Sequence, residues 1–299
     1  MISILLIILE QTCLYLPLVF GAYISISLMK LPDLSIESAY LFGAITASQY
    51  LLTCDTGVTF EMLPLTMLAA LAGGMFVGCI SSFLTQKIKI PHLLSSILTG
   101  GLFHGINQMI LGTSNVSLSK TQNYLSYVTI ETQHSELLML TLIALFLCAC
   151  YYFFLKTQLG YALAVYGNNA QFFTYHHISE SFVLYAGILI ANALAGLSGY
   201  LVALSTGFVD LTMNIGMSLF TISALILGKI LIKPRGMGTY LVPLVGTGSY
   251  FFLQSLLLNL GFNLKYFTMI QALIVVIFLG LSFRKKTTKE NQPIDTLGV

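Results

Sequence analysis

Residues 156–179 read KTQLGYALAVYGNNAQFFTYHHIS and form a polar island about midway along a very apolar chain. The runs before and after it, 136–155 and 181–205, are mostly apolar and long enough to cross a hydrocarbon core of about 30 Å. A polar segment between two membrane spans must lie in water or against another protein. This stretch therefore predicts a polytopic membrane protein with a functional segment near its centre.

The composition agrees with a membrane protein. Hydrophobic residues make up 57% of the 299 residues and charged residues 8%, whereas a soluble domain carries about 25% charged residues. We expect an all-α polytopic membrane protein with one transmembrane domain over residues 1–299. A net charge of +2 gives no indication of nucleic-acid binding. The start of the chain has no positively charged region, so no cleavable signal peptide is expected.

Apolar runs predict about nine spans, within a range of eight to ten. They cover residues 11–29, 38–53, 63–85, 91–111, 136–155, 181–204, 217–232, 239–260 and 266–283. The second and seventh of these are short. Residues 1–10 are expected to form a separate helix along the membrane surface, because Glu10 is poorly placed inside the membrane. The tail, 284–299, is polar.

Basic residues predict the orientation, because Lys and Arg are enriched in cytoplasmic loops. They follow alternate spans: Lys87, Lys89, Lys156, Lys233, Arg235, Arg284, Lys285, Lys286 and Lys289. The segment 156–179 and the C-terminus are therefore expected in the cytoplasm, and the polar stretch 112–135 outside the membrane. Lys265 is an exception to this pattern.

A short motif occurs twice, each time before one of the short spans. Asp33-Leu34-Ser35 precedes the second span and Asp210-Leu211-Thr212 precedes the seventh, an offset of 210 − 33 = 177 residues. Residues 11–111 then correspond to 181–283, and 136–155 is a connecting span. An offset of five spans inverts the second copy, and inverted repeats with discontinuous helices are typical of transporters. A chance match of three residues remains the alternative.

The two aspartates have two interpretations. Asp33 and Asp210 are expected at membrane-edge breaks, where a carboxylate can bind free backbone N–H groups and cap the following short helix. Ionisable residues near the hydrocarbon are also often functional, so both are candidates for the translocation pathway.

Two further spans carry polar residues. In 91–111, positions 104, 107 and 108 are expected to share a helical face. That polar face comprises Ser95, Ser96, Thr99, His104, Asn107 and Gln108. It is either part of the pathway or contact between helices. Asn192, in 181–204, has the same two interpretations.

The sequence contains none of the catalytic motifs that we sought. It has no Gly-x-x-x-x-Gly-Lys-Ser/Thr phosphate loop, no His-Glu-x-x-His helix and no serine nucleophile elbow. Its five cysteines lack paired metal-ligand spacing, and mid-span cysteines act as small apolar residues. We expect no catalytic residue and no metal site.

Several motifs in order carry a family resemblance. They are Leu9-Glu10-Gln11 with Tyr15, the run LPDLSIE at 31–37, Lys89-Ile90-Pro91, Asn115-Val116-Ser117-Leu118 and Gly207-Phe208-Val209-Asp210. Over nearly its whole length the chain resembles permeases of bacterial ABC importers of the branched-chain amino acid and ribose type. It is most similar to those paired with lipoprotein receptors for aromatic amino acids such as tryptophan and tyrosine. The order and spacing of the motifs, rather than any single motif, carry this resemblance.

The resemblance implies that 156–179 is the segment that docks on the ATPase subunit. The coupling residues it implies are Gly160, Gly167, Asn168, Asn169, Phe172, Tyr175, His176 and His177. Asn168 or Asn169 is expected to cap a short helix over residues 170–177. Ala164 stands where the family usually has arginine, and His176-His177 where it tends to have Leu-Gly. An ordinary solvated loop is the alternative.

The resemblance further implies a permease subunit in the bacterial inner membrane. Two copies would pair around a pathway for a small polar solute, an amino acid being the favoured class. A cytoplasmic ATPase would bind ATP and magnesium, a receptor lipoprotein would deliver the solute, and this chain would hold no cofactor. An ion-coupled secondary transporter is the alternative, and it would require a buried carboxylate in mid-membrane. An intramembrane enzyme is disfavoured by the absence of catalytic motifs.

Overall fold

The computed structural model describes residues 2–53, 63–118, 135–232, 238–261, 269–273 and 276. The longer helices are α1 (Ile2–Ala22), continued by the π-helical η1 (Tyr23–Leu28), α2 (Ser35–Thr53), α3 (Leu63–Gln86), α4 (His92–Leu111), α6 (Ser135–Leu155), α9 (Glu180–Thr206), α10 (Met217–Leu231) and α11 (Gly238–Asn259). The shorter elements are α7 (Gln158–Asn168), α8 (Gln171–Tyr175), β1 (Asn115–Ser117) and β2 (Phe208–Asp210). Most of the predicted ninth span, 266–283, and the whole tail, 284–299, lie outside the described residues.

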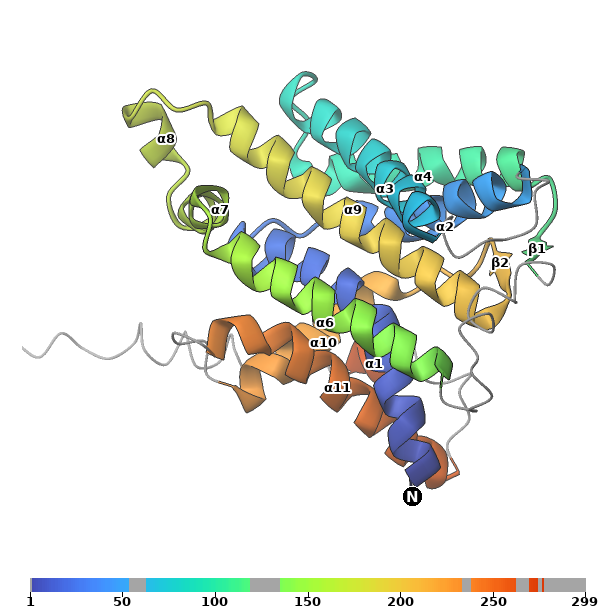
Figure 1. The fold of residues 1–299 in the computed structure, drawn as a ribbon. Coiled ribbons are helices and arrows are strands. Elements are labelled where there is room, and N and C mark those ends of the chain that lie inside the picture. Colours follow the sequence, from blue (N-terminus) through green and yellow to red (C-terminus); the bar gives the residue numbers. More distant parts are fainter. Residues whose placement is uncertain are drawn as a thin grey trace, which may run out of the picture.

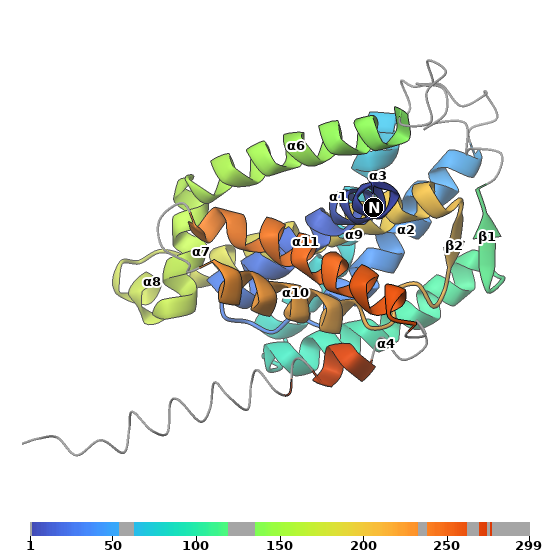
Figure 2. The same ribbon diagram turned by 90° about the horizontal axis from the view of Figure 1, so that it is seen from below.

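Helix α9 forms the centre of the bundle. It packs most extensively against α3 and α2 on one side and against α1 on the other, while α10 and α11 pack together and lie against α1 (Figures 1 and 2). In the most apolar stretch of α9, 83% of the residues are buried. The corresponding share is 22% for α6, which lies at the edge of the bundle. A helix that is buried around most of its circumference is a core helix rather than a lipid-facing one.

Small residues permit the close approach of α9 to its neighbours. A Cβ added at Gly43 of α2 would lie 2.3 Å from the Cα of Gly196 in α9, and one at Gly196 would lie 3.0 Å from the Cα of Gly74 in α3. Helix interfaces in membranes depend on such contacts, because lipid supplies no hydrophobic force between helices. The apolar runs alone did not indicate which faces would meet.

The described residues contain five helices that are long and apolar enough to span a membrane, within Ile4–Leu28, Leu63–Gln86, Leu137–Leu155, Glu180–Thr206 and Thr239–Asn259, and α10 is a shorter apolar helix. The separate helix expected over residues 1–10 is wrong. Helix α1 runs without interruption from Ile2 through Glu10, whose carboxylate accepts a hydrogen bond from the Ser205 hydroxyl at 3.3 Å. A partner on α9 thus satisfies Glu10 within the bundle.

The chain is helical, with one addition that the all-α prediction missed. Strands β1 and β2 pair in an antiparallel ribbon, with Val116 opposite Val209 and Asn115 opposite Asp210. Two segments about ninety residues apart, both of which carry family motifs, are thereby joined at one end of the bundle (Figure 1). Each strand has only three residues, too few for alternating polarity to reveal them in the sequence.

The opposite end of the bundle carries α7 and α8 (Figures 1 and 2). There, Lys30 Nζ donates a hydrogen bond to Asn168 Oδ1 at 2.7 Å, and the Ser181 hydroxyl donates to Gln86 Oε1 at 2.9 Å. The end of η1, the end of α3 and the start of α9 therefore lie together. Lys30, which follows the first predicted span, therefore lies at the same end of the bundle as the segment 156–179.

Candidate functional site

Asp33 lies at the break before α2, where the chain is not yet helical. Asp33 is only 2% exposed. Its Oδ1 accepts hydrogen bonds from the Ser35 backbone N–H at 2.9 Å and the Ser35 hydroxyl at 2.6 Å, and its Oδ2 accepts one from Asn192 Nδ2 at 3.0 Å. The predicted capping of α2 is confirmed, because Ser35 is the first residue of that helix. The same carboxylate also ties α2 to α9.

The position of Asn192 gives the depth of this cluster. Asn192 follows Glu180, the first residue of α9, by 192 − 180 = 12 residues, which is about 18 Å along a helix axis. Asp33 is therefore level with the middle of α9 rather than with its end. The Asn192 amide also donates to the Ile188 carbonyl at 3.0 Å, so both of its protons are used.

His92, the first residue of α4, approaches the same carboxylate. Its Nε2 lies 3.9 Å from Asp33 Oδ1, and its Nδ1 lies 3.3 Å from the Thr85 hydroxyl. The distance of 3.9 Å is too long for a hydrogen bond, and Nε2 has no hydrogen-bond partner among the described residues. The sequence analysis missed His92, although it directly follows the motif Lys89-Ile90-Pro91, because Asp33 lies 92 − 33 = 59 positions away in the sequence.

The start of α10 is capped from the other half of the chain. Glu37, in the first turn of α2, accepts a hydrogen bond from the Ser218 backbone N–H at 3.0 Å. The helix begins at Met217, after Gly216, whose φ of 84° lies in the left-handed region that favours glycine. The N-termini of α2 and α10 therefore meet inside the bundle, a contact between residues 181 positions apart.

Asp210 forms the same turn as Asp33 in a different place. Its Oδ1 accepts hydrogen bonds at 2.7 Å from both the backbone N–H and the hydroxyl of Thr212. The predicted capping of α10 by Asp210 is wrong, since that helix starts at Met217 and Glu37 supplies the bond to its first turn. Asp210 is half-buried and belongs to β2.

On α4 the predicted polar face divides into two. Ser95, Ser96, Thr99 and Asn107 are buried, whereas His104 and Gln108 are exposed. The expectation of one shared face is wrong: buried positions recur about every fourth residue, and 104 and 108 fall on the adjacent face. Most buried hydroxyls bond backbone carbonyls, as Ser96 does with Leu93 at 2.8 Å. Asn107 Oδ1 has no hydrogen-bond partner among the described residues.

The segment 156–179 is folded against the bundle. Leu163 of α7 is fully buried, and a Cβ at Gly167 would lie 1.9 Å from the Leu28 carbonyl oxygen. A Cβ at Gly160 would lie 2.6 Å from the Phe154 carbonyl oxygen, so both glycines permit direct backbone contact. Two of the glycines in the coupling motif therefore hold α7 against η1 and α6.

The prediction that the side chain of Asn168 or Asn169 caps the helix after α7 needs a correction. Helix α8 covers only Gln171–Tyr175, and Asn168 is the last residue of α7. Its side chain donates to the Ala164 carbonyl at 2.9 Å and accepts from Lys30. Asn169 contributes its backbone carbonyl to the turn, at 3.2 Å from the Phe172 N–H. Tertiary contact with Lys30 thus replaces the expected side-chain cap.

Aromatic and histidine side chains project from this segment. Tyr175 is 78% exposed and Phe172 is 39% exposed, with the Phe172 and His176 rings 4.3 Å apart. His176 and His177 are also exposed. At the start of the segment, a hydrogen bond of 2.5 Å to the Tyr152 hydroxyl raises the pKa of Lys156. Exposed apolar groups gathered at one end of a bundle are typical of a protein-binding surface.

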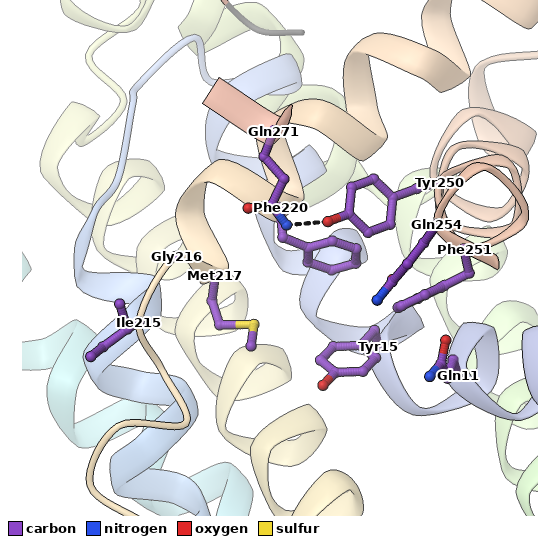
Figure 3. Close-up of a pocket in the computed structure, with 10 residues that line it drawn as sticks. All are labelled: Gln11, Tyr15, Ile215, Gly216, Met217, Phe220, Tyr250, Phe251, Gln254 and Gln271. Atoms are coloured by element: carbon purple, nitrogen blue, oxygen red, sulfur yellow. Dashed lines mark hydrogen bonds between the residues drawn. The ribbon is translucent and has the colours of Figure 1, made fainter. Parts of the chain in front are cut away.

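A separate cavity of about 270 Å³ lies among α1, α10, α11 and the segment 269–273 (Figure 3). We call it the aromatic pocket, after four of its lining residues, Tyr15, Phe220, Tyr250 and Phe251. Among the described lining residues, the polar groups are the amides of Gln11, Gln254 and Gln271 and the hydroxyls of Tyr15 and Tyr250. The Gln271 amide donates a hydrogen bond to the Tyr250 hydroxyl. Of these seven residues the sequence analysis singled out only two, Gln11 and Tyr15, and those as family motifs rather than as a site.

Comparison with known proteins gives the family. The profile described as "Branched-chain amino acid transport system / permease component" matches residues 4–279. The chain belongs to this permease family. It is a multi-pass membrane protein of an ABC transport system, in which a separate subunit hydrolyses ATP, and it is not itself catalytic. A permease component of this kind implies an ATPase and a solute-binding protein as partners.

Two relatives show the extent of the similarity. A protein of Clostridioides difficile (strain R20291) named "Tyrosine transport system permease protein" is 29% identical over 292 residues, which cover 94% of each chain. An uncharacterised protein of Rickettsia prowazekii (strain Madrid E) is 29% identical over 294 residues, which cover 95% of this permease and 99% of the relative. No solved structure matches the chain.

Proposed function

We propose that this permease carries an amino acid across the bacterial inner membrane, driven by an ATPase that docks on the segment 156–179. Two copies pair around the pathway, the C-terminus is cytoplasmic and a receptor lipoprotein delivers the solute on the opposite side. The family description and the name of the tyrosine permease relative support an amino acid as solute. The observation that carries the coupling role is the fit of Gly167 against Leu28.

That fit gives a route for force. Helix α7 contacts the end of η1 through Gly167, and η1 continues α1 into the core of the bundle. Lys30 and Asn168 add a hydrogen bond across the same contact. A rigid helix that is pressed against the end of another helix can transmit a displacement, whereas a loop without such packing would absorb it.

We further propose that residues 11–111 and 181–283 form an inverted repeat of about nine spans, with 136–155 as the connector. Two features support it: the same Asp turn at Asp33 and Asp210, and the meeting of the N-termini of α2 and α10. Discontinuous helices of this kind lie at the substrate site of many transporters. Asp33 and Asn192 are proposed to lie beside the pathway, together with Ser96 and Asn107; the exposed His104 and the ribbon residue Asp210 are weaker candidates.

The test uses Gly167→Ala in permease reconstituted with its ATPase. The added methyl group collides with the Leu28 carbonyl, so ATP-driven uptake should fall on the order of tenfold to a hundredfold while the protein still inserts. Gly105→Ala is the matched control, because a Cβ there has no atom within 4 Å. Equal uptake by both variants would contradict the coupling role. Solute flux through the permease without any ATPase would instead favour the ion-coupled alternative.

A further inference from the structure

The walls of the aromatic pocket are rings in edge and tilted contact. The Tyr15 and Phe220 centroids are 5.3 Å apart with their planes at 64°, and those of Phe220 and Tyr250 are 4.6 Å apart at 73°. The centroid of the Phe251 ring lies 5.3 Å from that of Tyr15. The four lining rings therefore pack against one another, and a further aromatic ring favours the same edge and tilted contacts with them.

The polar groups of the pocket leave hydrogen-bonding capacity unused. Gln271 is 8% exposed, and its Oε1 has no hydrogen-bond partner among the described residues, although its amide donates to Tyr250. The side chains of Gln11 and Gln254 make no hydrogen bond within the described part of the chain. Figure 3 shows Gln254 reaching from α11 toward the rings of Tyr15, Phe220 and Tyr250. A buried acceptor without a partner is costly and commonly has a ligand or a water in the functional state.

The described residues that line the pocket offer no countercharge. None of its described lining residues is Asp, Glu, Lys, Arg or His. Burying an unpaired carboxylate or ammonium group costs far more than burying a hydrogen-bonded neutral one. A solute with charged groups would therefore keep them outside. Ile215, which is 68% exposed, and Gly216 line the pocket beside the N-terminus of α10, and we call this exposed edge the mouth of the pocket.

The size of the cavity limits the ligand further. Cavities for drug-sized ligands measure about 300–1,000 Å³, and this one, at about 270 Å³, is below that range. It suits one ring with a small substituent.

The pocket lies toward the end of the bundle that carries β1 and β2, opposite α7 and α8. Its lining residue Gln11 follows Glu10, and Glu10 accepts a hydrogen bond from Ser205 near the end of α9.

We infer that the aromatic pocket binds the planar aromatic ring of the transported solute and that its glutamines bind a hydroxyl or ring N–H on that ring. The charged part of the solute stays at the mouth by Ile215 and Gly216. Gln254 is a specificity-determining residue, since its amide is the free polar group of α11 that faces the ring site. This inference rests on the proposed function and assigns a place to one part of the solute.

The test is photo-crosslinking in nanodiscs that hold the permease with its ATPase and receptor. One probe is 4-azidophenylalanine, a ring with a small substituent, and the other is photo-leucine, an aliphatic amino acid of similar charge. Mass spectrometry locates the labelled peptides. We expect the aromatic probe to label peptides from α10 and α11 that contain Met217 or Tyr250, and photo-leucine to label them weakly.

Variants then separate recognition from folding. Gln254→Leu keeps the volume of the side chain but removes its amide, so labelling by the aromatic probe should fall about fivefold, which corresponds to one net hydrogen bond. Phe252→Leu is the control, because Phe252 is 55% exposed on the adjacent face of α11. A fall for Gln254→Leu alone supports the inference.

Three outcomes would overturn it: labelling outside the pocket, equal labelling by both probes, or no effect of Gln254→Leu. ATP-driven uptake is measured in the same samples. If uptake depends on the ATPase but labelling lies elsewhere, the pocket assignment fails and the proposed function stands. If uptake does not depend on the ATPase, the proposed function itself fails.

Discussion

Asp33 and Asp210 begin the same tripeptide pattern and adopt the same turn, but they differ in their surroundings. Each Oδ1 accepts hydrogen bonds from the backbone N–H and the hydroxyl of the residue two positions later. Asp33 is buried and accepts a bond from another helix, through Asn192, whereas Asp210 is half-buried and accepts no such bond from the described residues. Local sequence therefore determines the turn, whereas the packing of α9 decides which copy becomes part of the core.

The largest expected difference is between Asp33→Ala and Asp210→Ala. Removing the Asp33 carboxylate leaves the Asn192 amide and the Ser35 N–H unpaired in a buried site, which should cost about 3–5 kcal/mol of unfolding free energy. Removing Asp210 leaves groups that water can reach, at about 1 kcal/mol. Thermal unfolding in nanodiscs compares the two variants. Similar losses would show that burial does not distinguish the motifs.

The bond between helices is isolated by Asn192→Ala. This change removes the donor to Asp33 Oδ2 and leaves a small gap against α3, for an expected loss of about 2–3 kcal/mol. Asn259→Ala is the matched control, because the Asn259 side chain is exposed and its bond among the described residues is to the Ser255 carbonyl of its own helix. A loss no greater than that of the control would mean that Asp33 does not need its partner on α9.

Glu37→Ala tests whether Glu37, rather than Asp210, caps α10, which begins at Met217. Without this carboxylate the Ser218 N–H in the first turn of α10 loses its cap, at about 1–2 kcal/mol. Hydrogen exchange of amides 217–219 should accelerate while the amides in the centre of α9 stay protected. Glu10→Ala, which loses a bond to a side chain but no helix cap, is the control. Unchanged exchange at Ser218 would contradict the cap.

The smallest effect is expected for Thr212→Ala. It removes one hydroxyl from an exposed turn and leaves the Thr212 backbone N–H bonded to Asp210, so the loss should be about 0.5 kcal/mol. Ser35→Ala, at the buried copy, removes a hydroxyl with contacts to both Asp33 and Asn192 and should cost about twice as much. Denaturant unfolding measures both losses. A larger loss for Thr212→Ala than for Ser35→Ala would contradict the comparison.

Most helix positions were predictable because long apolar runs have few alternatives in lipid. The run 63–85 became α3 over Leu63–Gln86, and 136–155 became α6 over Ser135–Leu155. The candidate site was predicted less well. Asn107 is buried and His104 is exposed, though both are polar and close on one helix, because a neighbouring helix covers only one of the two faces.

By itself the sequence determined that the chain spans a membrane, where most helices run, where the two Asp turns occur and which family it belongs to. These properties depend on composition, on runs of neighbouring residues and on motif order. Only the tertiary structure decided that Asp33 meets Asn192, that Glu37 caps α10 and that Tyr15, Phe220 and Tyr250 enclose one cavity. The physical reason is that burial and hydrogen-bond partners come from segments up to about 235 positions apart, which no local pattern specifies.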